Sequence, residues 1–443
     1  MSAQTQASIP VSIRELSRRL HEGTLTVEAV AESALAAARD GARSRAFTWL
    51  DEAGVARRVQ QLQEAGPGGP LWGVPVSVKD LFDVAGLPTT CGSPFYAGTR
   101  PVPDTDSGYV ARWRAAGALF TGKTVLNEFA YGITGENRCY GDCTQPARPD
   151  RLTGGSSSGA AASVLMGAAA IGLGTDTGGS LRVPAALCGL VSYRATLGFA
   201  DWSGSFPLAH AFDTLGWLQR SAADVAFVAR ALHPEVPVPV RPRAPRVGLV
   251  VGEWLAPAER EVLAALGRFA DLLEEAGAEV VRVEGAGWDK AVDLFVPIQA
   301  HEAHGIHSRY LPSHAGAYDP AILTRLEMGR NVGQARYQEL VGQREEFSRG
   351  VAALFDGVEL LLAPASAMRV LKAGADHSGT RPRLLKMTAP ASLGGLPVLT
   401  LPWLEDGEPG LGFQVMAPRG GDARLWGFAE WLSGVERFVG RIP

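Results

Sequence analysis

The chain has 443 residues, an apolar fraction of 46% and a formal net charge of -4. This length is enough for one large domain or for two to three ordinary ones, each with a buried core. Acidic and basic residues are mixed throughout, so the sequence offers neither a basic stripe for nucleic acid nor a polybasic face for a membrane. We therefore expect a small-molecule partner.

The N-terminus and the cysteines favour a cytoplasmic protein. Residues 1–10 lack the charged-then-apolar layout of a signal peptide, and no run approaches the roughly 20 apolar residues of a membrane span. The four cysteines form no Cys-x-x-Cys pair. Cys139 and Cys143 have no neighbouring ligands that would complete a metal site, so we expect unpaired thiols in a reducing compartment.

The first 70 residues are predicted to be mainly helical. Ser12 and Glu15 form a capping-box pattern that opens a helix to about Leu20, and Gly23 follows it. The periodicity predicts a second helix over 26–39, a strand over 46–50 and a third helix over 51–65.

A buried strand is predicted over 71–80, because Val74, Val76 and Val78 alternate along it. Lys79 lies at the end of this strand. A lysine in this position is ordinarily a solvated strand terminus, so its position alone does not establish a function. A long loop over 81–100, a helix over 106–116 and a strand over 118–122 are expected next.

Two Gly-Gly-Ser turns in residues 153–184 flank an alanine-rich apolar segment. Glycine pairs permit positive φ and close approach, so each turn can present a serine and a row of free N–H groups. A flexible linker is disfavoured because the glycines bracket apolar structure, and the spacing of phosphate-binding loops is missing. We expect a helix behind the first turn and a strand over 171–174 leading into the second, an arrangement that suits acyl transfer.

Strands and helices alternate through the rest of the chain. Strands are predicted over 246–251, 279–283, 359–363, 396–401 and 411–416, and helices over 257–276, 320–355 and 422–432. This alternation predicts an α/β fold with a large mixed β-sheet flanked by helices on both faces. We expect a single domain over 1–443, with N-terminal helices in 1–70, a core in 71–233, a variable region in 234–357 and the last part of the sheet in 358–443.

A histidine-rich segment raises the question of a metal site. It contains His301, Glu302, His304, His307 and His314, but it does not match the His-Glu-x-x-His pattern of zinc proteases. We interpret it as a polar helix face near the mouth of a pocket, and we expect neither a metal nor a cofactor.

The glycine-rich turns and their flanks resemble the amidase signature family. The matching stretches are Gly73-Val-Pro-Val-Ser-Val-Lys79-Asp, Gly154-Gly-Ser-Ser-Ser-Gly159, Gly174-Thr-Asp-Thr-Gly-Gly-Ser-Leu-Arg-Val-Pro184 and Leu396-Pro-Val-Leu-Thr-Leu-Pro402. Within the family the chain is most similar to short, plant-type indole-acetamide amidases. The stretches that carry this likeness are Thr121-Gly-Lys-Thr, Tyr131-Gly-Ile-Thr-Gly-Glu-Asn137 and Phe212-Asp-Thr-Leu-Gly-Trp217.

The resemblance implies a role for each of three residues. Ser180 matches the nucleophile, Ser156 the serine that relays protons after a cis peptide bond, and Lys79 the base. Choosing Ser157 or Ser158 instead of Ser156 breaks the spacing to the nucleophile.

Physical chemistry accounts for these roles, because burial lowers the pKa of a lysine and only the neutral amine is a base. Backbone N–H groups around Thr177, Gly178, Gly179 and Ser180 are expected to stabilise the oxyanion.

The resemblance implies an amidase that hydrolyses a small carboxamide to an acid and ammonia. A glutaminase subunit of a transamidation complex and a catalytically silent binding module are the alternatives, and a homodimer is possible. Asp176 and Arg182 are expected to hold the turn, although substrate contacts stay open for them. The wall of the pocket is open among Phe129, Tyr131 and Phe206, each of which suits the core equally well.

Overall fold

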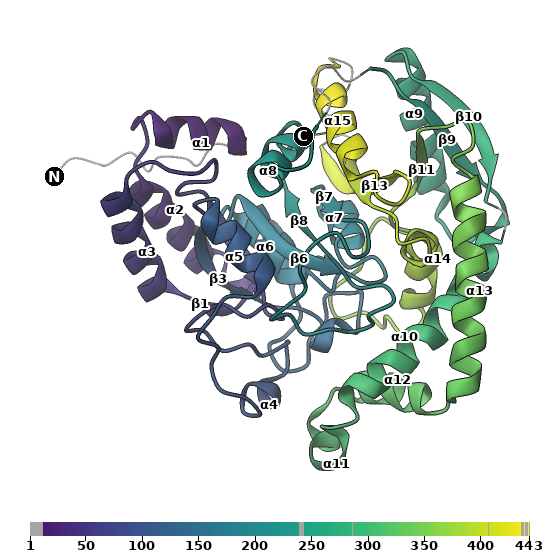
Figure 1. Ribbon diagram of the computed structural model, residues 1–443, viewed down its shortest axis with the longest axis horizontal. Coiled ribbons are helices and arrows are strands. Elements are labelled where there is room, and N and C mark those ends of the chain that lie inside the picture. Colours follow the sequence, from purple (N-terminus) through teal and green to yellow (C-terminus); the bar gives the residue numbers. More distant parts are fainter. Residues whose placement is uncertain are drawn as a thin grey trace.

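The computed structural model of the protein describes residues 12–238, 243–285, 287–405, 407–435, 438 and 442 (Figure 1). The prediction made for residues 1–10 lies outside the described residues, as do residues 239–242 of the predicted variable region. None of the helices in the described ranges is both long and apolar enough to cross a membrane.

One mixed sheet runs through the described chain and joins its two halves. Its eleven strands, in spatial order, are β1 (Phe47–Leu50), β3 (Leu119–Thr124), β2 (Pro75–Lys79), β6 (Ile171–Asp176), β8 (Thr214–Gln219), β7 (Val191–Arg194), β12 (Val398–Glu405), β13 (Glu408–Met416), β11 (Leu360–Pro364), β9 (Arg246–Val251) and β10 (Glu279–Glu284). A separate hairpin pairs β4 (Thr144–Gln145) with β5 (Arg148–Leu152).

Strand direction changes along the sheet. Strands β3, β2 and β6 are parallel to one another, as are β11, β9 and β10. The pairs between β6 and β11, and the outer pair of β1 with β3, are antiparallel. The predicted large mixed sheet is therefore confirmed.

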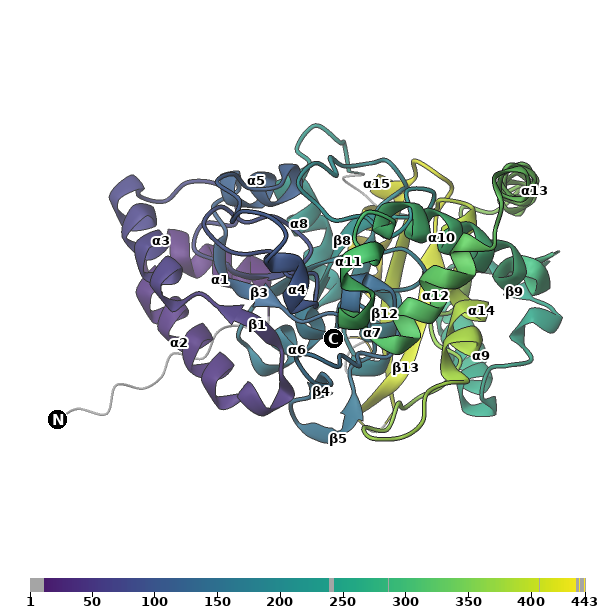
Figure 2. The same ribbon diagram turned by 90° about the horizontal axis from the view of Figure 1, so that it is seen from below.

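Helices cover both faces of this sheet. The connection from β2 through α5 to β3 and the connection from β3 through α6 to β6 run in opposite directions across the sheet, and right-handed crossovers place their helices on opposite faces. Figure 2 shows α5 and α8 on one side and α6 on the other. The helices are α1 (Ile13–His21), α2 (Val27–Asp40), α3 (Glu52–Ala65), α4 (Pro94–Ala97), α5 (Gly108–Ala115), α6 (Ser158–Met166), α7 (Arg182–Cys188), α8 (Val225–Leu232), α9 (Arg260–Glu275), α10 (Ala291–His307), α11 (Leu311–His314), α12 (Pro320–Arg330), α13 (Gln334–Ala353), α14 (Thr380–Leu393) and α15 (Asp422–Ser433).

Most predicted elements are present, and their caps explain where they begin. Ser12 accepts a hydrogen bond from the Glu15 N–H at 3.3 Å, as the capping box predicts. Helix α14 was missed by the sequence analysis. It contains Pro382 and Pro390, and its second half is buried on all sides, so it shows no helical alternation of apolar and polar residues.

The order of the strands brings two chain segments to one edge of the sheet. Strands β2 and β6 are parallel neighbours, with Val78 opposite Leu173, so their carboxyl ends lie side by side. Lys79 ends β2 and Asp176 ends β6. Carboxyl ends of parallel strands are where open α/β sheets place their ligands.

We expect the substitution of Gly172 by alanine to test how tightly α6 packs on β6. A Cβ atom at Gly172 would lie 2.6 Å from the carbonyl oxygen of Ala160 in α6, so Gly172→Ala forces the helix away. We expect a loss of about 1–3 kcal/mol in the free energy of unfolding, measured by urea denaturation. Gly305→Ala, in α10, meets nothing within 4 Å and should gain up to about 1 kcal/mol from helix propensity. Equal stabilities for the two variants would contradict this packing.

Candidate active site

Lys79 lies at the centre of a cluster of hydroxyl groups beneath the two glycine turns. Its side chain is fully buried. The Nζ atom lies 2.8 Å from Ser156 Oγ, 3.0 Å from Ser157 Oγ and 2.8 Å from Thr175 Oγ1. The structure therefore brings Lys79 and Ser156 together and adds two hydroxyls to which the sequence analysis gave no role.

Burial determines the protonation of Lys79. It lowers the pKa of this amine to about 7, against the attraction of Asp176 and Asp213. Ser157 donates its own proton to the Thr175 carbonyl oxygen at 3.1 Å, so its oxygen must accept from Lys79. The lone pair of the neutral amine is then free to accept a proton from Ser156 or from the Thr175 hydroxyl.

The peptide bond between Gly155 and Ser156 is cis, as expected. The Gly155 N–H donates to the Ile133 carbonyl at 2.8 Å, and a Cβ atom at Gly155 would lie 2.1 Å from Asn127 Oδ1. Close packing of this kind fixes the position of Ser156 above Lys79.

Ser180 follows the second turn and lines a pocket. The Ser157 N–H donates to the Ser180 carbonyl oxygen at 3.1 Å, which ties the two turns together. The pocket is open to solvent. Its lining residues are Ala130, Tyr131, Gly132, Ile133, Thr177, Gly178, Ser180, Gln299, Arg381 and Leu385.

Backbone N–H groups of the second turn differ in their availability. The Gly179 N–H donates to Asp176 Oδ1 at 2.9 Å, so it is already occupied. The N–H groups of Thr177, Gly178 and Ser180 donate to no acceptor among the described residues. Gly179 has φ 121°, and a Cβ atom there would lie 2.9 Å from Thr388 Oγ1, so only glycine fits this turn.

Asp176 holds the turn through a fully buried network. Its carboxylate accepts from Arg182 at 2.8 Å and 3.0 Å, from Arg194 at 2.9 Å, and from two backbone N–H groups of the turn. Burial alone would raise the pKa of Asp176, but the two guanidinium groups hold it well below its usual range. Arg182 also donates to the Thr388 carbonyl at 2.7 Å and to Ser392 Oγ at 2.8 Å, so the network anchors α14 as well.

A second buried carboxylate supports the pocket wall. Asp213 accepts from the Thr177 hydroxyl at 2.6 Å and from the N–H groups of Leu208 and Ala209 at 2.7 Å and 2.9 Å. Burial raises the pKa of Asp213 to about 6, although these hydrogen bonds oppose the shift. The hydrogen bond from the Thr177 hydroxyl to Asp213 fixes the rotamer of Thr177, which lines the pocket.

Of the three aromatic wall candidates, only Tyr131 lines the pocket. Phe129 and Phe206 pack on each other and on His307 in the core, with ring centroids 5.3 Å apart for the two phenylalanines. The sequence analysis missed Gln299 and Arg381, because each lies more than a hundred residues beyond the turns and follows no recognisable motif.

The histidine-rich segment does not converge on one point. His301 stacks on Tyr337, and His307 is buried with its Nδ1 atom 2.8 Å from the Tyr318 hydroxyl. Within the described parts of the chain, no group of three or more His, Cys, Asp or Glu residues is arranged to hold a metal ion. The four cysteines are free thiols.

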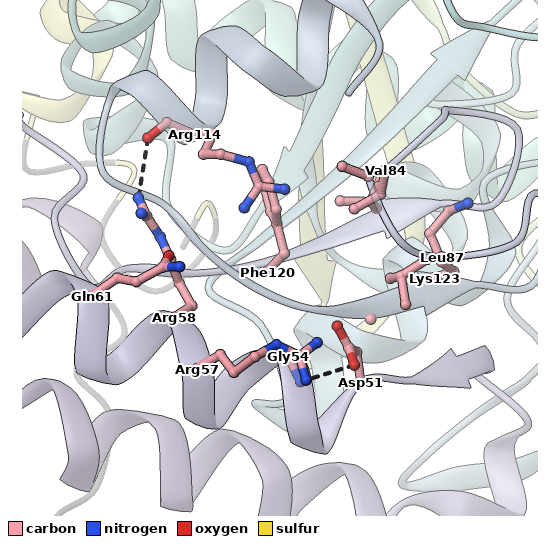
Figure 3. Close-up of a pocket in the computed structure, with 13 residues that line it drawn as sticks. Asp51, Gly54, Arg57, Arg58, Gln61, Val84, Leu87, Arg114, Phe120 and Lys123 are labelled. Carbon is pink, nitrogen blue, oxygen red and sulfur yellow. Dashed lines mark hydrogen bonds between the residues drawn. The ribbon is translucent and has the colours of Figure 1, made fainter. Parts of the chain in front are cut away.

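A larger cavity lies beside α3 and β3 and does not include Ser180 (Figure 3). It contains Arg57, Arg58 and Arg114 but no hydroxyl, thiol or imidazole group among its lining residues. Lys123, which also lines it, pairs with the buried Asp80 at 2.7 Å. Without a nucleophile this cavity is not a candidate for acyl transfer.

The chain is similar to known proteins over most of its length. The Amidase family model matches residues 27–426. The chain is 33% identical to 2-amino-5-chloromuconic acid deaminase of Comamonas testosteroni, covering 91% of this chain and 88% of the relative. It is 31% identical to indoleacetamide hydrolase of Pseudomonas savastanoi, covering 98% of each. A solved amidase structure is 32% identical with a TM-score of 0.88, covering 95% of this chain and 99% of that one.

The Asp176 network predicts a large effect on stability. Asp176→Asn keeps the volume of the side chain but leaves two buried guanidinium groups without their carboxylate. We expect a loss of about 3–5 kcal/mol in the free energy of unfolding, measured by chemical denaturation. Glu15→Gln removes an exposed partner of Arg18 and should leave stability unchanged. Similar stabilities for both variants would refute the role given to Asp176.

Proposed function

The chain belongs to the amidase family of hydrolases that act on amide C–N bonds, and from this premise we propose that it hydrolyses a small carboxamide to a carboxylic acid and ammonia. The observation that carries the proposal is the buried 2.8 Å contact between Lys79 Nζ and Ser156 Oγ, in a turn that is tied to Ser180 by the Ser157 N–H. One relative is named as a deaminase and the other as a hydrolase of indoleacetamide, and both names support the release of ammonia.

The first half of the proposed reaction forms an acyl-enzyme. Neutral Lys79 accepts the Ser156 proton while Ser156 accepts the proton of Ser180, and Ser180 Oγ attacks the amide carbon. The carbonyl oxygen becomes an oxyanion, which the free N–H groups of Thr177, Gly178 and Ser180 stabilise. Gly179 was expected to donate its N–H to the oxyanion, but this N–H donates to Asp176 instead. Gly179 is needed because a side chain at this position would collide with Thr388.

The second half returns the protons. When the C–N bond breaks, the proton held by Lys79 passes through Ser156 to the leaving nitrogen, and ammonia departs. Water then gives a proton to the same relay and attacks the ester of Ser180, and the acid leaves as the serine regains its proton. The base, the relay and the nucleophile are all side chains of this chain.

Activity measurements on serine variants test the proposed roles. We expect ammonia release from a panel of small carboxamides, including indole-acetamide, benzamide and glutamine, and a fall of about 10³-fold or more in kcat/KM for Ser180→Ala and Ser156→Ala. Ser158→Ala is the matched control, because Ser158 donates to the Val125 carbonyl at 3.3 Å and does not contact Lys79.

Other outcomes would replace the proposal. Turnover of glutamine alone, and only with a copurified partner, would favour the glutaminase subunit. No ammonia from any amide, with the wild type and Ser180→Ala indistinguishable, would favour the binding module.

The pH profile distinguishes two groups that titrate close together. Because only neutral Lys79 is a base, kcat/KM should rise about tenfold per pH unit below about 7 and level off above it. Asp213, with its pKa raised to about 6, also titrates in this range. In Asp213→Asn the rise should persist and move to lower pH, because the attraction that stabilises the charged lysine is lost. Disappearance of the rise would assign it to Asp213 instead.

A further inference from the structure

Arg381 is a guanidinium group in the wall of the Ser180 pocket. It lies in the first turn of α14, is half-buried, and lines both this pocket and the adjoining cavity that shares Gly132 and Ile133 with it. Its Nη2 donates to Gln299 Oε1 at 2.6 Å, and its Cζ lies 5.7 Å from the centre of the Tyr131 ring. These contacts hold the side chain in one place without neutralising its charge.

No carboxylate of the described residues forms an ion pair with Arg381, although three acids line the adjoining cavity. Each is bonded elsewhere. Glu128 accepts from a serine hydroxyl at 2.5 Å and from a backbone N–H at 2.7 Å. Glu136 accepts from a threonine hydroxyl at 2.7 Å, and Asp319 caps α12 through a backbone N–H at 2.8 Å. The positive charge in the pocket wall is therefore left without its natural counter-ion.

Another cation increases this imbalance. Arg325 lies over the same Tyr131 ring, with its Cζ 5.8 Å from the ring centre, and donates to the Tyr131 carbonyl. Burial lowers the pKa of Arg381 to about 10, and repulsion from Arg325 adds to the shift. Placing a guanidinium group in a partly desolvated wall without an anion is unfavourable, and a bound carboxylate reverses that cost through charge-assisted hydrogen bonds.

We propose that Arg381 binds a carboxylate of the substrate while the amide of the same molecule lies against Ser180, so that the substrates are small monoamides of dicarboxylic acids. This inference rests on the proposed amidase function. Tyr131, Ile133 and Leu385 line the same pocket as Arg381 and Ser180, and their apolar surface suits a hydrocarbon spacer.

Calorimetry on variants without turnover tests carboxylate recognition apart from catalysis. In the Ser180→Ala background we expect at least one of malonamate, succinamate and glutaramate to bind at least about tenfold more tightly than the neutral amide of equal carbon number, namely propionamide, butyramide or valeramide. Adding Arg381→Met should abolish this preference, because it weakens binding of the acid amides at least about tenfold more than binding of the neutral amides. Adding Arg383→Met is the matched control, because this exposed arginine of the same helix donates, among the described residues, only to the Pro257 carbonyl.

Kinetics on the otherwise wild-type chain provide the second readout. Arg381→Met should raise KM for the acid amides by about tenfold or more, and it should raise KM for the neutral amides by a smaller factor. The inference is overturned if no acid amide binds, if neutral amides bind equally well, or if Arg381→Met weakens both classes alike. Preferential binding of acid amides without any hydrolysis would instead refute the amidase proposal and leave the carboxylate site intact.

Discussion

The buried carboxylate of Asp176 is the interaction on which the site depends. A glycine-rich turn has little intrinsic preference for one conformation, and its backbone groups need fixed partners. Asp176 provides them by accepting two N–H groups of the turn and two guanidinium groups at once. The arginines then reach outward to neighbouring elements, so the shape of the turn is set by the whole central sheet.

Lys79 lies near this network but forms no ion pair among the described residues. The lysine lies among hydroxyl groups, which satisfy its hydrogen bonds but carry no formal charge. A carboxylate in direct contact would keep the amine protonated at neutral pH, and an apolar wall would leave its N–H groups unpaired. Hydroxyl partners satisfy the hydrogen bonds of the amine without holding it in the charged form. One of these hydroxyls, that of Ser156, is in position to exchange a proton with Lys79.

Local sequence was sufficient to predict part of this arrangement. Lys79 ends a strand, and Ser156 and Ser180 lie in the glycine-rich turns that precede α6 and α7. The alternation of Val74, Val76 and Val78 predicted the buried strand that carries the lysine. The mixed sheet with helices on both faces followed from alternating element patterns.

The pocket wall was not predictable in the same way. Gln299 and Arg381 reach the site only because α10 and α14 pack against each other, and no local pattern records a contact between helices so far apart in the chain. Proline at two positions and burial on all sides concealed α14 itself. Tertiary packing places Tyr131 in the wall of the Ser180 pocket, whereas it places the similar side chains of Phe129 and Phe206 in the core.

Helix α14 carries both the wall and the anchor of the turn on one face. Arg381, Leu385, Thr388 and Ser392 follow one another at intervals of four, three and four residues, the spacing of a single helical stripe. The first two line the pocket, and the last two bind Gly178 and Arg182. A shift of this helix would therefore disturb reactivity and selectivity together. Redesign of the substrate range must accordingly proceed by exchanging side chains at the first turns of α14, while the backbone of the helix stays in place.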